Sequence, residues 1–228
     1  MKLSIKQAVG SLYLLFITYL PGNVGIELRR RYYSKRLRKC GKDLVICTNV
    51  HINGLSMIEI GNNVKIRENV IIHTGKPSNL TEDKREMIEI TSYDKCEKGL
   101  ISIGNNSRIA FGAIMLGYGG IKIGENCGVG PGAKIYSESF HYKGRNPKIM
   151  YKYSEGAPQE QQCNLQGVVK FKDGAGVASN VIVLPGATIG KDSWVGPNSV
   201  VGVKAKIPDY TIVRGDPVRV VFKRKYQA

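Results

Sequence analysis

Three histidines are the residues of this sequence best suited to acid–base chemistry: His51, His73 and His141. Imidazole has an ordinary pKa of about 6.5, so near neutral pH it can accept or release a proton, and it also binds metals. The histidines are far apart in the chain and include no close pair, which argues against a shared zinc ion. We therefore expect proton transfer by a single histidine.

The cysteines show neither a C-x-x-C pair nor an even disulfide framework, so we expect free thiols in a reducing cytosol and no metal site. They are Cys40, Cys47, Cys96, Cys127 and Cys163.

The elements that must position the histidines follow from a repeat of six residues. Aliphatic side chains recur at this spacing, often followed by Gly and Asn, as in "IGNN" and "IGEN". Neither a helical period of 3.6 nor strict alternation produces it, but a short strand with a tight turn does, with Gly and Asn at turn positions of positive φ. Stacked units share one core, so the sequence predicts an all-β solenoid. The repeat positions are Ile60, Ile66, Ile72, Ile103, Ile109, Met115, Ile123, Val129, Ile135, Phe171, Val177, Val183, Ile189, Val195, Val201 and Ile207.

Two long segments, about residues 74–101 and 142–167, interrupt the repeat. His73 directly precedes the first, and His141 stands at the second, in "GAKIYSESFHYKG". Loops that leave a solenoid gather on a binding face, so both histidines are candidates for lining a cleft. His51 belongs to an early coil, where we expect a surface or packing role.

The repeat resembles that of the left-handed parallel β-helix acyltransferases, a trimeric class that includes serine, galactoside and maltose acetyltransferases. The resemblance covers about residues 44–221 and is most specific in residues 171–221, which contain "IGKDSWVGPNSVV" and the closing "IPDYTIVRGDPVRVV". It implies a left-handed β-helix, a homotrimer, acetyl-CoA as co-substrate and a sugar or glycan acceptor. The basic segment ahead of the repeats is similar to that of members modifying capsule, O-antigen or other surface sugars.

The resemblance also implies that His141 is the catalytic base, because it occupies the position of the family's histidine and the other two histidines do not. Neutral imidazole would take the proton of a sugar hydroxyl as that oxygen attacks the thioester, and a backbone N–H would stabilise the oxyanion. A carboxylate often orients such a base. Glu138, Glu155 and Glu160 are candidates, as is a backbone carbonyl, and Glu138 is preferred.

By the same resemblance, acetyl-CoA would lie in a groove between adjacent subunits, held mainly by backbone groups of the C-terminal coils. Motif positions place Ala178 and Ser179 nearest the thioester, and Gly196 and Pro197 on the next coil. The nucleotide phosphates need a cation, which would be Lys204 or Lys206.

The sequence departs from the family pattern at two points. Gly176 stands where many members carry an aromatic residue, and the only tryptophan, Trp194, follows three hexapeptides later, about one coil along the same face. We expect Trp194 either to act for that aromatic from the next rung or simply to pack. The acceptor-contacting Asn of the family has no counterpart around residues 111–114, so the acceptor sugar is not identified.

The N-terminal segment, residues 1–42, has ten Lys and Arg against the single acid Glu27, within a chain of net charge +16. Its apolar run, Ala8 to Leu20, would rise about 20 Å as a helix, less than the roughly 30 Å of a hydrocarbon core. The segment either packs on this or a neighbouring subunit, or dips into an anionic membrane, and the adjoining basic cluster favours the membrane. No motif indicates nucleic acid.

The predicted organisation is a basic helical segment (1–42), a β-helix (43–221) and a basic tail (222–228). The predicted function is O-acetyl transfer from acetyl-CoA to a sugar, in the cytoplasm or peripherally at the inner face of its membrane. N-acetylation of an amino sugar, a non-catalytic membrane scaffold and a zinc hydratase similar to the γ-carbonic anhydrases remain alternatives.

Overall fold

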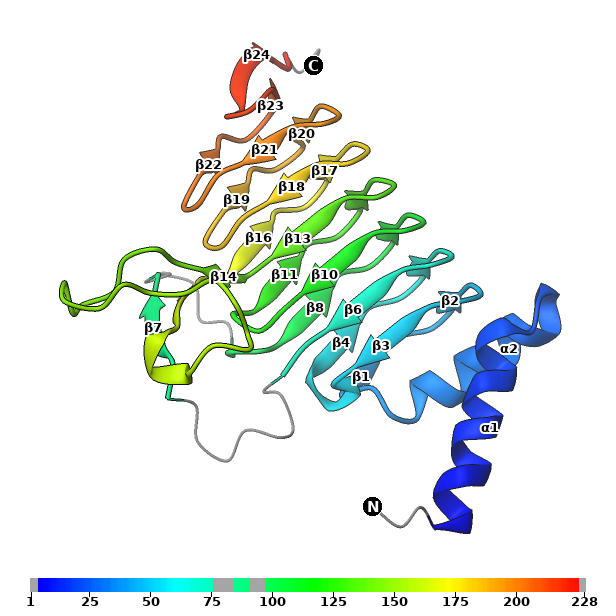
Figure 1. Ribbon diagram of the computed structural model, residues 1–228. Helices are drawn as coiled ribbons and strands as arrows, with labels where there is room; N and C mark the ends of the chain where they lie inside the picture. The colour runs from blue at the N-terminus through cyan, green and yellow to red at the C-terminus, as the bar shows by residue number, and fades with distance from the viewer. Residues whose placement is uncertain (1–3, 76–83, 91–96, 226–228) are drawn as a thin grey trace.

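The chain forms a left-handed parallel β-helix with two helices at its N-terminal end, as the computed structural model shows (Figure 1). The structure describes residues 4–75, 84–90 and 97–225. The fold class predicted from the six-residue repeat is thereby confirmed. Successive strands rotate through three long sheets, so each coil contributes one short strand to each face of the solenoid.

The sheets are called A to D, and the strands of each follow in the order in which they pair. Sheet A is β1 (Lys39–Cys40), β4 (Ile58–Ile60), β8 (Ile101–Ile103), β11 (Ile121–Ile123), β16 (Val169–Phe171), β19 (Thr188–Ile189) and β22 (Lys206–Ile207). Sheet B is β2 (Val45–Ile46), β5 (Lys65–Ile66), β9 (Arg108–Ile109), β12 (Gly128–Val129), β17 (Gly176–Val177), β20 (Trp194–Val195), β23 (Thr211–Arg214) and β24 (Arg219–Lys223). Sheet C, counted from the N-terminal end, is β3 (His51–Asn53), β6 (Ile71–His73), β10 (Ile114–Leu116), β13 (Lys134–Tyr136), β18 (Ile182–Val183) and β21 (Val200–Val201). Sheet D is β14 (Glu138–Phe140), β15 (Cys163–Gln166) and β7 (Glu86–Glu89). The helices are α1 (Ile5–Tyr19) and α2 (Gly22–Ser34), and short 3-10 turns cover Leu55–Met57 and Gln159–Gln161.

The aliphatic repeat positions form the core. Every one of the sixteen predicted side chains, from Ile60 to Ile207, is buried. Burying one such side chain stabilises the fold by about 1.5–3 kcal/mol relative to leaving it in water. Many units add a second buried apolar side chain two residues earlier, such as Val64, Val70 and Val181, and the stacked units share one core.

The corners between the sheets are made by residues in the left-handed conformation, many of them asparagines. Asn180 has φ 57° and Asn198 φ 53°, and their side-chain amides are hydrogen-bonded at 3.2 Å across a separation of 18 residues. Asn49 and Asn69 make the same contact at 2.7 Å across 20 residues in the early coils. Asparagine tolerates this backbone region, and its side chain links one coil to the next.

The two helices pack on the first coil. Ser4 caps α1 in a capping box with Gln7, and α2 follows directly after Pro21. Strand β1 begins at Lys39, slightly before the predicted start of the β-helix, and β24 continues to Lys223, slightly beyond its predicted end. Strand β24 folds back antiparallel on β23 and closes the C-terminal end.

The tryptophan lies one coil after the glycine that replaces the family's aromatic residue. Gly176 pairs with Trp194 in the ladder between β17 and β20. A Cβ placed on Gly176 would come within 2.7 Å of two carbon atoms of the indole ring. Trp194 therefore covers the backbone of Gly176 from the next rung, and its side chain remains 42% exposed.

Gly176→Ala should push the indole away from this position and destabilise the fold by about 1–3 kcal/mol through overpacking. Because Trp194 is the only tryptophan, its fluorescence reports the displacement directly, and we expect emission at longer wavelength together with a lower unfolding midpoint. Gly202→Ala is the matched control, since a Cβ there meets no atom within 4 Å. An emission spectrum that does not change in Gly176→Ala would contradict the packing described.

Candidate functional site

Both insertions leave the solenoid at the same edge. The first lies between β6 of sheet C and β8 of sheet A, and the second between β13 of sheet C and β16 of sheet A. Their strands then pair with one another: β15 of the second insertion is flanked by β14 and by β7 of the first. The two interruptions thus build one structure, sheet D, beside the solenoid (Figure 1).

The base of the second insertion is closed by buried hydrogen bonds around Ser137. Its carbonyl accepts from the N–H of Gly167, where the chain returns, and its hydroxyl accepts from the N–H of Gly119 at 2.9 Å. A Cβ on Gly119 would lie 2.4 Å from the Ser137 carbonyl oxygen, so this approach requires glycine. The insertion therefore starts from a fixed point.

His141 directly follows β14 and continues its pairing, because its N–H donates to the carbonyl of Cys163 at 2.7 Å. The side chain is half-buried, and its ring meets that of Tyr142 edge to face. The N–H of Tyr142 donates to Nδ1 of His141 at 3.1 Å. In this arrangement Nδ1 carries no proton, so the neutral imidazole holds its proton on Nε2.

Glu138 has partners other than His141. Its carboxylate accepts from the side-chain amide of Asn164 at 2.5 Å, from that of Gln166, and lies 3.5 Å from the guanidinium of Arg85. Alternation along a strand places Glu138 and His141 on opposite faces of sheet D. In the structure the carboxylate that we expected to orient the base is instead held by this cluster.

The Glu138 cluster also contains two buried acceptors without a donor. Asn164 and Gln166 use their NH₂ groups on Glu138, which leaves Oδ1 of Asn164 and Oε1 of Gln166 buried and unpaired. Burial, followed by the charge of Glu138, raises the pKa of the neighbouring Tyr118. The Glu138 side chain, held between two amides and a guanidinium, stabilises sheet D from one side.

The face of sheet D that carries His141 presents another carboxylate, Glu86. The ladder runs from His141 to Cys163 and on to Glu86, which puts Glu86 two strands away, at about 10 Å. The hydroxyl of the buried Tyr151 and the N–H of Arg145 donate to its carboxylate. The Tyr151 hydrogen bond, followed by that of Arg145, lowers the pKa of Glu86.

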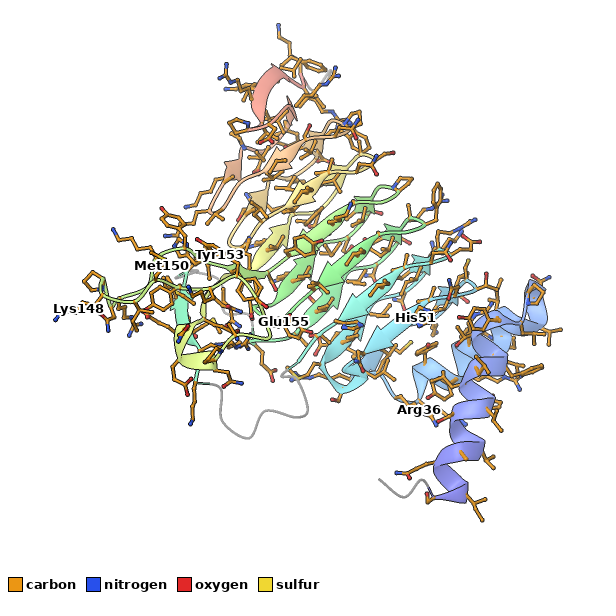
Figure 2. All side chains as sticks on the ribbon, in the orientation of Figure 1. Arg36, His51, Lys148, Met150, Tyr153 and Glu155 are labelled. Atoms are coloured by element: carbon orange, nitrogen blue, oxygen red, sulfur yellow. The ribbon has the colours of Figure 1, made fainter. Side chains whose placement is uncertain are left out.

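The other two acids proposed as helpers, Glu155 and Glu160, are exposed on the second insertion. Glu160 lies 3.8 Å from the ammonium of Lys84. Lys148 lies at the outer end of this insertion, away from the solenoid (Figure 2), and Met150 and Tyr153 are also exposed.

The proposed cofactor contacts occupy two edges of the solenoid. Ala178 and Gly196 follow β17 and β20 at the edge between sheets B and C, and each is followed by its predicted partner, Ser179 or Pro197. Their N–H groups donate to the carbonyls of Val195 and Val213, so donation to a cofactor would break the coil ladder.

Lys204 and Lys206 lie elsewhere. Lys204 occupies a left-handed corner between sheets C and A, the same edge at which the insertions depart, and Lys206 begins β22. Both side chains are exposed. The insertions with His141 and the ammonium group of Lys204 therefore lie at the same edge of the solenoid, with Lys204 nearer the C-terminal end.

The remaining histidines lie near α1. His51 and His73 line a depression of about 250 Å³ together with Leu14, Thr18, Tyr33, Val50, Ile52 and Asn53. His51 is exposed, and its Nε2 lies 2.8 Å from the amide oxygen of Asn49. The described residues contain no group of three or more His, Cys, Asp or Glu placed to hold a metal ion.

Cys40, Cys47, Cys127 and Cys163 are free thiols, while Cys96 lies outside the described residues. Burial raises the pKa of Cys127 to about 11 and also raises that of Cys163, the thiol nearest His141 in the ladder. Both are therefore poor nucleophiles near neutral pH.

The sequence did not indicate Glu86, Arg85, Asn164 or Gln166, because the six-residue repeat that predicts strands elsewhere is missing from both insertions. The available signal was weak: Cys163 and Leu165 in "QCNLQG", and Ile88 and Ile90 in "REMIEI", are two residues apart as in a strand, but Met87 interrupts the alternation. Nothing in either segment identifies the other as its partner.

Solved structures resemble this chain in fold. AntD, an N-acyltransferase from Bacillus cereus in complex with dTDP and coenzyme A, matches with a TM-score of 0.68 and 21% identity, over 87% of this chain and 90% of that one. A maltose O-acetyltransferase from Clostridium difficile 630 matches with a TM-score of 0.53 and 20% identity, over 96% and 86%. A hexapeptide-repeat-containing acetyltransferase from Vibrio cholerae gives 0.52 and 18%, over 96% and 90%. No protein-family model matches the chain.

Glu138→Ala should loosen sheet D, because it leaves Asn164, Gln166 and Arg85 without their shared acceptor. Leaving a buried amide unpaired costs about 1–3 kcal/mol, which we expect to appear as faster hydrogen exchange in residues 138–141 and 163–166. Glu160→Ala, at an exposed position of the same insertion, should leave this exchange unchanged. Equal exchange in the two variants would contradict the role of the cluster.

Acidification should open the contact between Glu86 and the second insertion. Because the folded-state pKa of Glu86 is lowered from its ordinary 4.5, the contact stabilises the fold above that value and is lost as pH falls through the lower pKa. Amide exchange at Arg145, corrected for its intrinsic pH dependence, should therefore accelerate below pH 4.5. In Glu86→Gln this additional acceleration should disappear, since the amide oxygen accepts at every pH.

Proposed function

We propose that this protein transfers an acetyl group from acetyl-CoA to a hydroxyl of a sugar, in the biosynthesis of capsule, O-antigen or another surface glycan, with His141 as general base. The observation that carries the proposal is the position of His141 on a sheet that both insertions build together at one edge of the solenoid. The fold shared with AntD and the maltose O-acetyltransferase supports it.

In the proposed reaction the sugar oxygen attacks the thioester carbonyl while the imidazole of His141 removes its proton. A backbone N–H stabilises the tetrahedral oxyanion. Collapse of that intermediate breaks the C–S bond, and the imidazolium returns the proton to the leaving thiolate. The products are the acetylated sugar and free coenzyme A, and no thiol or hydroxyl nucleophile of the protein takes part.

The base must present an unprotonated nitrogen to the acceptor. Nδ1 is occupied by the N–H of Tyr142, and Nε2 carries the proton in the same tautomer. For Nε2 to act as the base, the ring must release the Tyr142 N–H and protonate Nδ1 instead. This exchange requires Nδ1 of His141 and the Tyr142 N–H to separate when substrate binds. Glu138 contributes by fixing the strand that carries His141, and Ala or Gln at this position would act on the base indirectly.

Acetyl-CoA would bind in a groove between adjacent subunits of a homotrimer. Ala178, Ser179, Gly196 and Pro197 lie along one edge of the solenoid, and the insertions with His141 leave at another. A site that uses both edges needs a second copy of the chain. Lys204 or Lys206 would meet the nucleotide phosphates, and the exposed indole of Trp194 would border the groove.

We place the reaction in the cytoplasm, with residues 1–42 in peripheral contact with the inner face of the cytoplasmic membrane. Helix α1, at 15 residues, rises about 22 Å and is shorter than a hydrocarbon core. None of the helices in the described ranges combines the length and apolar character needed to cross a bilayer.

N-acyl transfer to an amino sugar is the second candidate. It is favoured by the higher structural similarity to AntD, an N-acyltransferase, than to the maltose O-acetyltransferase, with TM-scores of 0.68 and 0.53. A panel of sugar nucleotides that differ only in bearing a hydroxyl or an amine at one carbon separates the two, because the product is an acid-stable amide or an alkali-labile ester.

His141→Ala should lower the rate of thiol release from acetyl-CoA in the presence of acceptor by about 10²–10⁴-fold, the usual contribution of a general base. His51→Ala and His73→Ala provide controls at the two other histidines and should retain the rate. Undiminished thiol release by His141→Ala would contradict the role of His141 as general base. A fold check by unfolding midpoint accompanies each variant.

A further inference from the structure

Helix α1 turns its most apolar stripe toward solvent. Ile5, Val9, Leu12, Phe16 and Tyr19 follow one another at steps of three and four residues, so they share one helical face. All five are exposed, with Ile5 85%, Leu12 65% and Phe16 57% accessible. A surface helix of a globular protein normally shows the reverse arrangement, with its apolar stripe facing the core.

The opposite face of α1 is fixed to the protein. Ile17 and Thr18 are buried, and Leu14 is half-buried against the first coils. The buried guanidinium of Arg29 in α2 donates to the carbonyls of Ile17 at 2.5 Å and Leu20 at 2.8 Å, at the C-terminal end of α1. It also donates to Ile46 of β2 at 2.7 Å.

Arg29 thus joins α1, α2 and the first coil, and it meets the negative end of the α1 dipole. A Cβ on Gly25 would lie 1.9 Å from the carbonyl oxygen of Leu20, so only glycine permits α2 to approach this closely. The outward direction of the apolar stripe is therefore built into the fold.

Aromatic contacts lead from the edge of this stripe to one cation, Arg36. Tyr13 lies at its margin, with its ring centroid 6.1 Å from that of Tyr32, and the guanidinium of Arg36 lies 3.9 Å from the centroid of the Tyr32 ring. Figure 2 shows Arg36 beside α1 at the N-terminal end of the solenoid. Lys35 and Lys39 are exposed nearby in sequence, and Glu27 is shared between Arg30 and Arg31.

An exposed apolar stripe next to positive charge favours one kind of covering surface over another. A second copy of the chain would bring an equally basic segment against the first, and like charges repel. An anionic lipid surface offers hydrocarbon to Leu12 and Phe16, phosphate to Arg36 and its neighbours, and an interfacial layer to Tyr13 and Tyr19. The charge therefore favours lipid over self-association.

We propose that α1 lies in the plane of an anionic membrane surface with Ile5, Val9, Leu12, Phe16 and Tyr19 inserted, that Arg36 binds lipid phosphate, and that Arg29 holds the helix in this orientation. The inference deepens the proposed membrane location and does not depend on the chemistry at His141. It also restricts the acceptor to glycans that can reach a membrane-bound enzyme.

The test is cosedimentation of the full chain with vesicles of phosphatidylcholine alone or with phosphatidylglycerol. We expect binding to the anionic vesicles only. Leu12→Glu/Phe16→Glu should weaken it at least tenfold, and Arg36→Ala about fivefold, the contribution of one basic residue near an anionic surface. The matched controls Phe222→Glu and Arg219→Ala, exposed positions of β24 at the other end of the solenoid, should bind as the unmodified chain does.

Sedimentation velocity and acetyl transfer to a soluble acceptor are measured on the same variants. Unchanged oligomeric state and activity in Leu12→Glu/Phe16→Glu, with vesicle binding lost, support the proposal. Equal binding by this variant and the unmodified chain overturns it, as does dissociation of the oligomer without any vesicle binding by the unmodified chain. Absence of acetyl transfer in every protein, with vesicle binding as expected, would instead contradict the function proposed for His141.

Discussion

The whole molecule depends on coils that stack in register. Each coil is held to the next by parallel strand pairing and by the apolar side chains that its six-residue units send to the core. No coil could bury those side chains alone, so the stability of any one depends on both neighbours. Because of this constraint, extra residues can be inserted at the corners, where left-handed residues such as Asn180 and Asn198 connect the sheets, but not within the strands.

The insertions obey this constraint. Each leaves after a sheet C strand and returns before a sheet A strand, so no coil loses a strand. Thr74 donates to the carbonyl of Gly99 where the first insertion closes, and Ser137 accepts from Gly167 where the second closes. Because both depart at one edge, with only the coil that ends in β10 between them, their strands are close enough to pair. Sheet D is therefore a product of the stacking, and it places His141 at a defined point outside the core.

The sequence predicted what depends on local spacing and missed what depends on pairing between distant segments. The sixteen core positions and the one-coil separation of Gly176 and Trp194 follow from counting residues. The contacts of Glu138 with Asn164 and Gln166 span 26 and 28 residues, and that of Tyr151 with Glu86 spans 65. No periodicity links such residues, so the sequence favours the nearest acid as the helper of His141. Strand alternation instead sends Glu138 to the far face.

The same stacking connects helix α1, proposed to contact a membrane, with His141, proposed as the general base. Arg29 ties the end of α1 to the carbonyl of Ile46, which belongs to the first coil, and every later coil is paired strand by strand to the one before it. The insertions extend that connection, since β14 begins immediately after the buried Ser137. The direction of the α1 stripe thus determines which edge of the solenoid faces a membrane on which α1 lies. Under the proposed function, a buried arginine far from His141 in sequence would thereby set how the site meets its acceptor, without contacting either.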